Sequence, residues 1–183
     1  TISNNMWVAC GKKYYIPWTI KINGEIYNTL NLEGRRVIIS MESKSLGDTI
    51  AWSPYVVEFQ KKHNCEVLYS TFHNHFFEGL DEYKNITFIK PGGSYDCTAV
   101  YRLGWFKKDN KWGDTDRNPN QVNLIPLQQT ATDILGLEFK ELNYGLKFPK
   151  GDNPLEKEYV VFGPNATAGC KEWDYNYWVE LSK

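Results

Sequence analysis

The sequence lacks long apolar runs, an excess of charge of either sign, and the common nucleotide-binding motifs. Its longest apolar runs, such as Val37-Ile38-Ile39, are far shorter than the roughly 20 residues that a membrane-spanning helix needs. Lys and Arg total 21 against 22 Asp and Glu, so no basic excess argues for nucleic acid binding. Neither Gly-x-Gly-x-x-Gly nor Gly-Lys-Ser/Thr occurs, which excludes the dinucleotide fingerprint and the Walker loop.

Closely spaced cysteines are also missing. The four cysteines are widely separated and form no Cys-x-x-Cys pair, so the sequence shows neither a zinc knuckle nor a redox motif: Cys10, Cys65, Cys97 and Cys170. The sequence contains no signal-peptide pattern. We therefore expect four free thiols in a reducing compartment, and a cytoplasmic protein.

Two groups of candidate metal ligands are incomplete. His73 and His75 would share a face on a strand but would diverge on a helix, and no third ligand accompanies them. Asp109, Asp114 and Asp116 lack the Gly and Glu positions of an EF-hand loop. The sequence thus predicts no metal site, and a solvated loop around the three aspartates.

What the sequence does contain is an ordinary globular composition with many aromatic residues. Hydrophobic residues make up 42% and charged residues 23% of the 183 residues, and 7 are Trp and 12 are Tyr. The aromatic residues fit either a core with hairpins, or platforms that stack sugars or contact a partner. Because the chain opens at Thr1 without an initiator Met and closes at Lys183 inside an expected helix, we expect a piece of a longer protein.

The pattern of apolar residues predicts an α/β fold. Residues 1–34 have hairpin character, with a turn at Asn23-Gly24, which suits a type I′ geometry. After Gly34, strands and helices alternate, which predicts a mainly parallel, Rossmann-like sheet with flanking helices. The expected strands are 14–16, 18–22, 25–27, 36–41, 66–70, 86–89, 98–103 and 159–162, and the expected helices are 49–63, 72–80 and 127–135, the last capped by Gly136. Pro54 either kinks the first helix or restarts it with Ser53 as the cap.

Polar segments divide the chain further. Residues 107–123 hold few apolar positions and predict a long loop. Residues 147–156, with two prolines and a glycine, have the composition of an inter-domain linker. We expect a main domain over 35–148, and a linker with the start of a second, truncated domain over 149–183.

The chemistry concentrates where the first parallel strand ends. Sheets of this kind bind ligands at the carboxyl ends of their strands. There, Ser45-Leu46-Gly47-Asp48 enters a helix, whose first N–H groups are free to bind an anion. Gly47 permits close approach of a substrate. Asp48 fits either a helix cap or a catalytic carboxylate.

Several segments in order resemble ADP-heptose glycosyltransferases with the GT-B fold, and within them the bacterial autotransporter heptosyltransferases. The resemblance covers roughly residues 20–183, as the N-terminal half of such an enzyme. It rests on Ser45-Leu46-Gly47-Asp48-Thr49-Ile50-Ala51, Tyr101-Arg102-Leu103-Gly104-Trp105, Ile125-Pro126-Leu127-Gln128-Gln129, Asp133-Ile134-Leu135-Gly136, and Ala166-Thr167-Ala168-Gly169-Cys170-Lys171-Glu172-Trp173.

The resemblance implies a role for each matching position. Asp48 would be the general base that deprotonates the acceptor hydroxyl in an inverting transfer. Gly47 would line the donor site, and Thr167 and Lys171 would contact the donor phosphates. From its residue type alone, Lys171 equally fits a solvated surface lysine.

The resemblance also implies the reaction and its partners. The donor would be ADP-heptose or a similar nucleotide-sugar, and the acceptor a hydroxyl of an autotransporter-type adhesin, modified in the cytoplasm. No resident cofactor is expected in this piece, because the cysteine-ligated iron of the family lies in the other half, and the parent protein is open to homo-oligomerisation. The piece alone would be inactive. The alternative is a non-catalytic or degenerate α/β module that recognises a partner protein.

Overall fold

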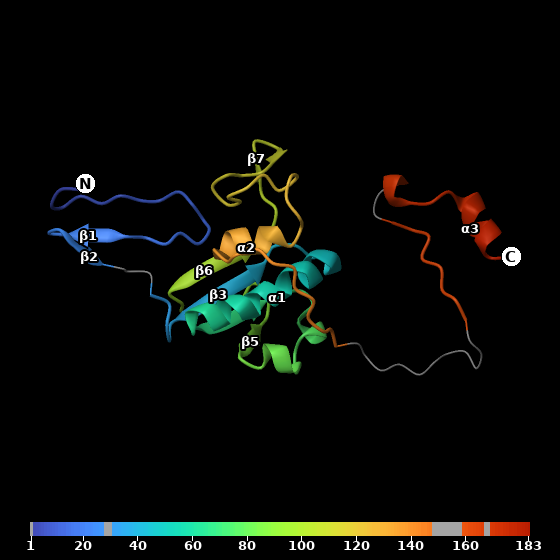
Figure 1. The fold of residues 1–183 in the computed structure, drawn as a ribbon, viewed down its shortest axis with the longest axis horizontal. Helices are drawn as coiled ribbons and strands as arrows, with labels where there is room; N and C mark the ends of the chain where they lie inside the picture. The colour runs from blue at the N-terminus through green and yellow to red at the C-terminus, as the bar shows by residue number, and fades with distance from the viewer. Residues whose placement is uncertain (1, 28–30, 148–158, 167–168) are drawn as a thin grey trace. The chain divides into compact units, whose positions relative to one another are not determined.

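A computed structural model describes residues 2–27, 31–147, 159–166 and 169–183 (Figure 1). These residues divide into two compact units, 1–148 and 149–183, and each is described by itself. Most of the expected linker at 147–156 lies outside the described residues, as does Thr167.

The centre of the first unit is a four-stranded parallel sheet with the strand order β5-β4-β3-β6. Its strands are β3 (Arg36–Met41), β4 (Glu66–Ser70), β5 (Ile86–Ile89) and β6 (Ala99–Leu103). In the register, Ile38 of β3 lies beside Leu68 of β4 and Val100 of β6. The parallel α/β fold is therefore confirmed, and these four strands lie within one residue of their expected bounds.

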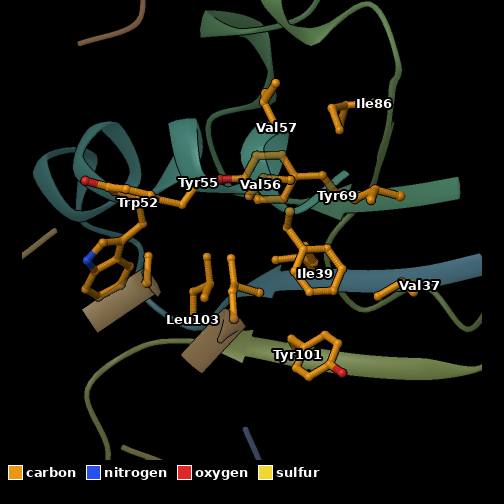
Figure 2. Close-up of a cluster of buried hydrophobic side chains, with 14 of the residues drawn as sticks. Val37, Ile39, Trp52, Tyr55, Val56, Val57, Tyr69, Ile86, Tyr101 and Leu103 are labelled. Atoms are coloured by element: carbon orange, nitrogen blue, oxygen red, sulfur yellow. The ribbon is translucent and has the colours of Figure 1, made fainter. Parts of the chain in front are cut away.

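One face of this sheet carries the core. Residues alternate across a strand, so Val37 and Ile39 point to the same face, where both are fully buried. Helix α1 (Leu46–His63) packs there, and α2 (Gln129–Leu135) contacts both α1 and β6. Figure 2 shows side chains of α1 and of the strands gathered in one cluster, among them Trp52, Tyr55 and Leu103.

Helix α1 is continuous across its proline. It begins at Leu46, three residues before the expected start, with Ser45 as its N-cap, and Asn64 ends it in the left-handed conformation. Ser53 lies inside the helix and donates its hydroxyl to the carbonyl of Thr49 at 2.6 Å. The interpretation in which Ser53 caps a restarted helix at Pro54 is therefore wrong.

Among the other expected elements, one hairpin agrees with the structure, and the strand at 14–16 and the helix at 72–80 do not. The hairpin of β1 (Ile20–Ile22) and β2 (Glu25–Tyr27) is confirmed around Asn23-Gly24. Residues 14–16, however, form no strand, because the backbone N–H of Tyr15 donates to the carbonyl of Ile134 within α2 at 2.8 Å. The expected helix at 72–80 is also absent.

A 3₁₀ turn, η1 (Asn74–Phe76), takes the place of that helix, and a second one, η2 (Asp81–Tyr83), follows after residue 80. The side chain of Asn74 explains the break. Its Oδ1 accepts from the backbone N–H of Thr71 at 3.0 Å, and its Nδ2 donates to the carbonyl of Ile89 at 3.0 Å. An asparagine that bonds to backbone groups on both sides favours a turn over a helix.

The segment after β6 is more ordered than a solvated loop. It contains a short hairpin of β7 (Lys107–Lys108) and β8 (Lys111–Trp112). Asn118 is buried, donates to the carbonyl of Gly104 and accepts from the N–H of Phe106. Asp114 is 9% exposed. The prediction of a solvated loop holds for Asp109, which is exposed. It is wrong for Asp114, which is buried and whose Oδ1 accepts from the backbone N–H of Asp116 at 3.0 Å.

The second unit contains η3 (Gly169–Lys171) and α3 (Tyr175–Leu181), which is capped by Asp174. The expected buried strand at 159–162 is not formed, and all four of its residues are exposed. A strand needs a neighbour to bond to, and no strand lies in the described part of this unit. None of the helices in the described ranges is long and apolar enough to cross a membrane.

Candidate functional site

The candidate site lies where β3 ends and α1 begins. Met41 ends the strand, and the next residues form a turn whose last member, Ser45, caps the helix. The Oγ of Ser45 accepts from the backbone N–H of Asp48 at 3.4 Å. The cap position is therefore taken by Ser45, and Asp48 is the third residue of the helix.

The carboxylate of Asp48 is half-buried and has one fixed oxygen. Its Oδ2 accepts from the hydroxyl of Ser43 at 2.6 Å. The same hydroxyl accepts from the backbone N–H of Ser45 at 3.1 Å. Among the described residues, no Lys, Arg or His side chain forms an ion pair with Asp48, and no residue donates a hydrogen bond to its Oδ1. Asp48 thus has a free oxygen available to a ligand.

Gly47 borders a hollow of about 600 Å³ beside α1. Its other lining residues come from α1 and from two later segments: Ile50, Ala51, Pro54, Gln128, Glu141, Leu142, Asn143 and Tyr144. The first of these are apolar and the later ones mostly polar, which is a composition that ligand pockets share. A Cβ at Gly47 would meet only the Oγ of Ser45, at 3.8 Å.

The far wall of this hollow is held to α1 by Glu58. Its Oε1 accepts from the hydroxyl of Tyr144 at 2.6 Å and from the Nζ of Lys61 at 2.9 Å, while Lys140 lies 3.2 Å from Oε2. Burial alone would raise the pKa of Glu58, but these three partners outweigh it and lower the pKa to about 2. The wall is therefore anchored by an ionised carboxylate at neutral pH.

A second hollow of about 480 Å³ lies along the carboxyl ends of the strands. Its charged lining residues are Glu42, Lys90 and Arg102, and Gly92-Gly93 and Tyr95 form its outer part. Arg102 pairs with Glu42 at 3.7 Å. Glu42 directly precedes Ser43, so this hollow borders the turn that holds Asp48.

Two of the three residues expected to contact the donor, Thr167 and Lys171, belong to the second unit. Lys171 ends η3 and is exposed. Thr167 lies outside the described residues. Lys171 belongs to the second unit and Asp48 and Gly47 to the first, so they are described separately.

The remaining candidate ligands form no metal site within the described residues, where no group of three or more His, Cys, Asp or Glu could hold an ion. His73 donates through Nε2 to the carbonyl of Lys44 at 2.9 Å, with the His75 ring 6.3 Å away. All four cysteines are free. Burial raises the pKa of Cys65 to about 11, so its thiol stays protonated.

Ser43, the partner of the Asp48 carboxylate, is a residue that the sequence did not indicate. Its bond to Asp48 closes a turn over five residues, and a serine in a polar turn has no distinctive pattern. A capping-box spacing from Ser45 to Asp48 is the signal that could have drawn attention to this turn.

Comparison with known proteins points to one group of enzymes. No family model matches the chain. The autotransporter heptosyltransferase Aah of Escherichia coli is 29% identical over 184 residues, which cover 96% of this chain and 46% of Aah. BimC of Burkholderia thailandensis, named an inactive autotransporter heptosyltransferase, is 26% identical over 96% of this chain and 43% of its own length.

The fold matches solved structures as well. The crystal structure of TibC from enterotoxigenic E. coli, an iron-containing dodecameric glycosyltransferase, has a TM-score of 0.77 at 26% identity, covering 96% of this chain and 47% of TibC. TibC in complex with ADP-D-beta-D-heptose gives a TM-score of 0.72 at 25% identity, with the same coverage.

The chain is thus a relative of the autotransporter heptosyltransferases, and it corresponds to the N-terminal half of such a protein. It spans about half the length of the curated relatives that it matches. The described residues offer no group of ligands for the iron that TibC contains.

Proposed function

We propose that this chain is the acceptor-side half of a glycosyltransferase that moves a heptose from ADP-heptose to a hydroxyl of an acceptor protein, with Asp48 as the general base. The observation that carries the proposal is the state of Asp48. Its carboxylate is half-buried at the carboxyl end of β3, is not used as the helix cap, and keeps one oxygen without a partner among the described residues.

The chemistry needs one carboxylate in this state. In an inverting transfer, the acceptor oxygen bonds to the anomeric carbon of the sugar while the bond from that carbon to the diphosphate oxygen breaks. The proton of the hydroxyl passes to the base, here Oδ1 of Asp48, and the leaving diphosphate carries the negative charge. A carboxylate already bound to a Lys or Arg would be a weaker proton acceptor.

The proposed donor is inferred from the relatives of this chain. TibC has been solved with ADP-D-beta-D-heptose, and we infer the same class of donor for the protein that contains this chain. Gly47, Thr167 and Lys171 would contact its sugar and phosphates, Lys171 as a point charge. By the same reasoning we propose a homo-oligomer, since TibC is dodecameric, and a cytoplasmic reaction, since all four thiols are free.

The test is Asp48→Asn in a protein that joins this chain to a complete donor-binding half. We expect transfer to fall by about a hundred- to ten-thousandfold, because Asn keeps the volume but cannot take a proton. Mass spectrometry of a co-expressed autotransporter adhesin measures the transfer, and calorimetry with ADP-heptose measures donor binding, which Asp48→Asn should leave intact. Lys171→Ala is the matched comparison and should weaken donor binding. Near-normal transfer by Asp48→Asn would refute the proposal.

A second candidate function is favoured by one relative. BimC is named inactive although it matches 96% of this chain, so kinship alone does not establish catalysis. The alternative is a non-catalytic module that binds a partner protein. It predicts that no heptose reaches the co-expressed adhesin even with the unaltered sequence, whereas the adhesin still copurifies with it.

A further inference from the structure

The direction of the hydrogen bonds around Ser43 is fixed by chemistry. A backbone N–H can only donate, so the Oγ of Ser43 must accept from Ser45 in their 3.1 Å bond. Its single proton is then available for the 2.6 Å bond to Oδ2 of Asp48. A short O–H···O⁻ bond of this length is typical of a charge-assisted pair.

Ser43 also releases Asp48 from helix capping. In a capping box, the acidic side chain at the third helical residue reaches back to the N–H of the cap residue. Here Ser45 is the cap and Asp48 is the third helical residue. The N–H of Ser45 is nevertheless taken by Ser43, so the carboxylate of Asp48 is not used by the helix end.

We propose that Ser43 is a positioning residue that binds Oδ2 of Asp48 and thereby presents Oδ1 to the acceptor hydroxyl. This inference rests on the function proposed above. Without the Ser43 hydroxyl, the carboxylate is free to rotate and to bond to the N–H of Ser45, as in an ordinary capping box. The reacting oxygen would then point away from its working position for much of the time, and small misplacements of reacting groups are costly in rate.

The experiment compares Ser43→Ala with Ser43→Thr in the same joined protein, with ADP-heptose and the adhesin found to be modified. Ser43→Ala should lower kcat by about ten- to a hundredfold and leave the KM for ADP-heptose unchanged. Ser43→Thr keeps the hydroxyl and should restore most of kcat. Ser43→Cys retains the volume with a weak donor, and should lower kcat even if the alanine variant does not fold.

A matched control separates positioning from general loss of a hydrogen bond. Asn120 donates to the carboxylate of Asp133 at 2.8 Å on the surface, and Asn120→Ala should leave kcat unchanged. Wild-type kcat in Ser43→Ala or Ser43→Cys would overturn the inference, and so would equal losses in the alanine and threonine variants. If Asp48→Asn is inactive while Ser43→Ala is normal, only this inference fails. If Asp48→Asn is active, the proposed function fails first.

Discussion

His63, the last residue of α1, is a half-buried histidine in an aromatic cluster. Its ring centroid lies 4.4 Å from that of Phe59 and 5.2 Å from that of Tyr15. Its Nε2 is buried and has no hydrogen-bond partner. Burial, and then the charge of Lys62, lowers the pKa of His63 below its usual 6.5. The neutral ring is therefore part of the packing that holds residues 12–16 against α1.

We predict that stability falls as the pH drops below about 6.5. A histidine whose pKa is lower in the folded state binds more protons when unfolded, so acid favours unfolding, and the loss begins at the unfolded pKa near 6.5. Urea unfolding at about pH 7.5 and about pH 5.5 measures the difference. His63→Phe should reduce this pH dependence, whereas His75→Gln, at an exposed position, should not. An equal pH dependence in wild type and His63→Phe would contradict the assignment.

At the scale of elements, the end of α2 and the N-terminal segment depend on one glycine. Gly136 ends α2 with φ +63, and a Cβ there would meet the ring of Tyr15. Gly34 has a similar φ of +65, but a Cβ there would meet nothing within 4 Å. The two positions therefore separate backbone strain from a steric clash.

We expect Gly34→Ala to cost about 1 kcal/mol of unfolding free energy, the penalty of a left-handed residue with a Cβ. Gly136→Ala should cost about 2 to 4 kcal/mol, because displacing Tyr15 adds an overpacking penalty. It should also speed tryptic cleavage at Lys12 and Lys13, which Gly34→Ala should not. Urea unfolding and timed proteolysis check both statements, and equal costs for the two variants would show that Tyr15 moves aside freely.

The elements that could be predicted from the sequence are those whose conformation is determined by neighbouring residues. The short β-branched run at 36–41 and the glycine after 127–135 carry enough local signal to predict β3 and the end of α2. Residues 14–16 have strand propensity, but their conformation is set by contacts with residues more than forty positions away, such as Phe59. The burial of Asn118 could not be predicted either, since a polar residue in a polar segment gives no sign of burial.

In the candidate site, too, the location of Asp48 could be predicted from the sequence and its side-chain partner could not. The chain order placed Asp48 at the carboxyl end of a strand, which the structure confirms as its location. Its catalytic role stays a prediction. The partner of its carboxylate, Ser43, depends on the conformation of the turn, and no spacing rule encodes that.

For the whole molecule, the location of the core predicts how the two units fold. The buried hydrophobic cluster lies between Leu32 and Leu135, and the side chains packed around it extend from Tyr14 to Leu146. The described side chains of the second unit are exposed, except for a half-buried Trp178. A unit of this size without a core rarely folds alone.

We therefore predict that a chain of residues 1–148 unfolds cooperatively, with a Tm within about 3 °C of that of residues 1–183. Residues 149–183 alone should show no cooperative transition. Calorimetry of the three chains measures this. A fall in Tm of more than about 5 °C on removing 149–183 would show that the second unit stabilises the first.

The bond between Tyr15 and Ile134 also sets an order in time. During synthesis the chain leaves the ribosome from its N-terminus at about 5 to 20 residues per second. About 120 residues separate the two partners, so Tyr15 waits roughly 6 to 24 seconds before its acceptor emerges. Strands β3, β4 and β5 can assemble in that interval, before Tyr15 takes its place beside Phe59 and Tyr101. A segment that is made well before its partner is thus among the last to reach its native place.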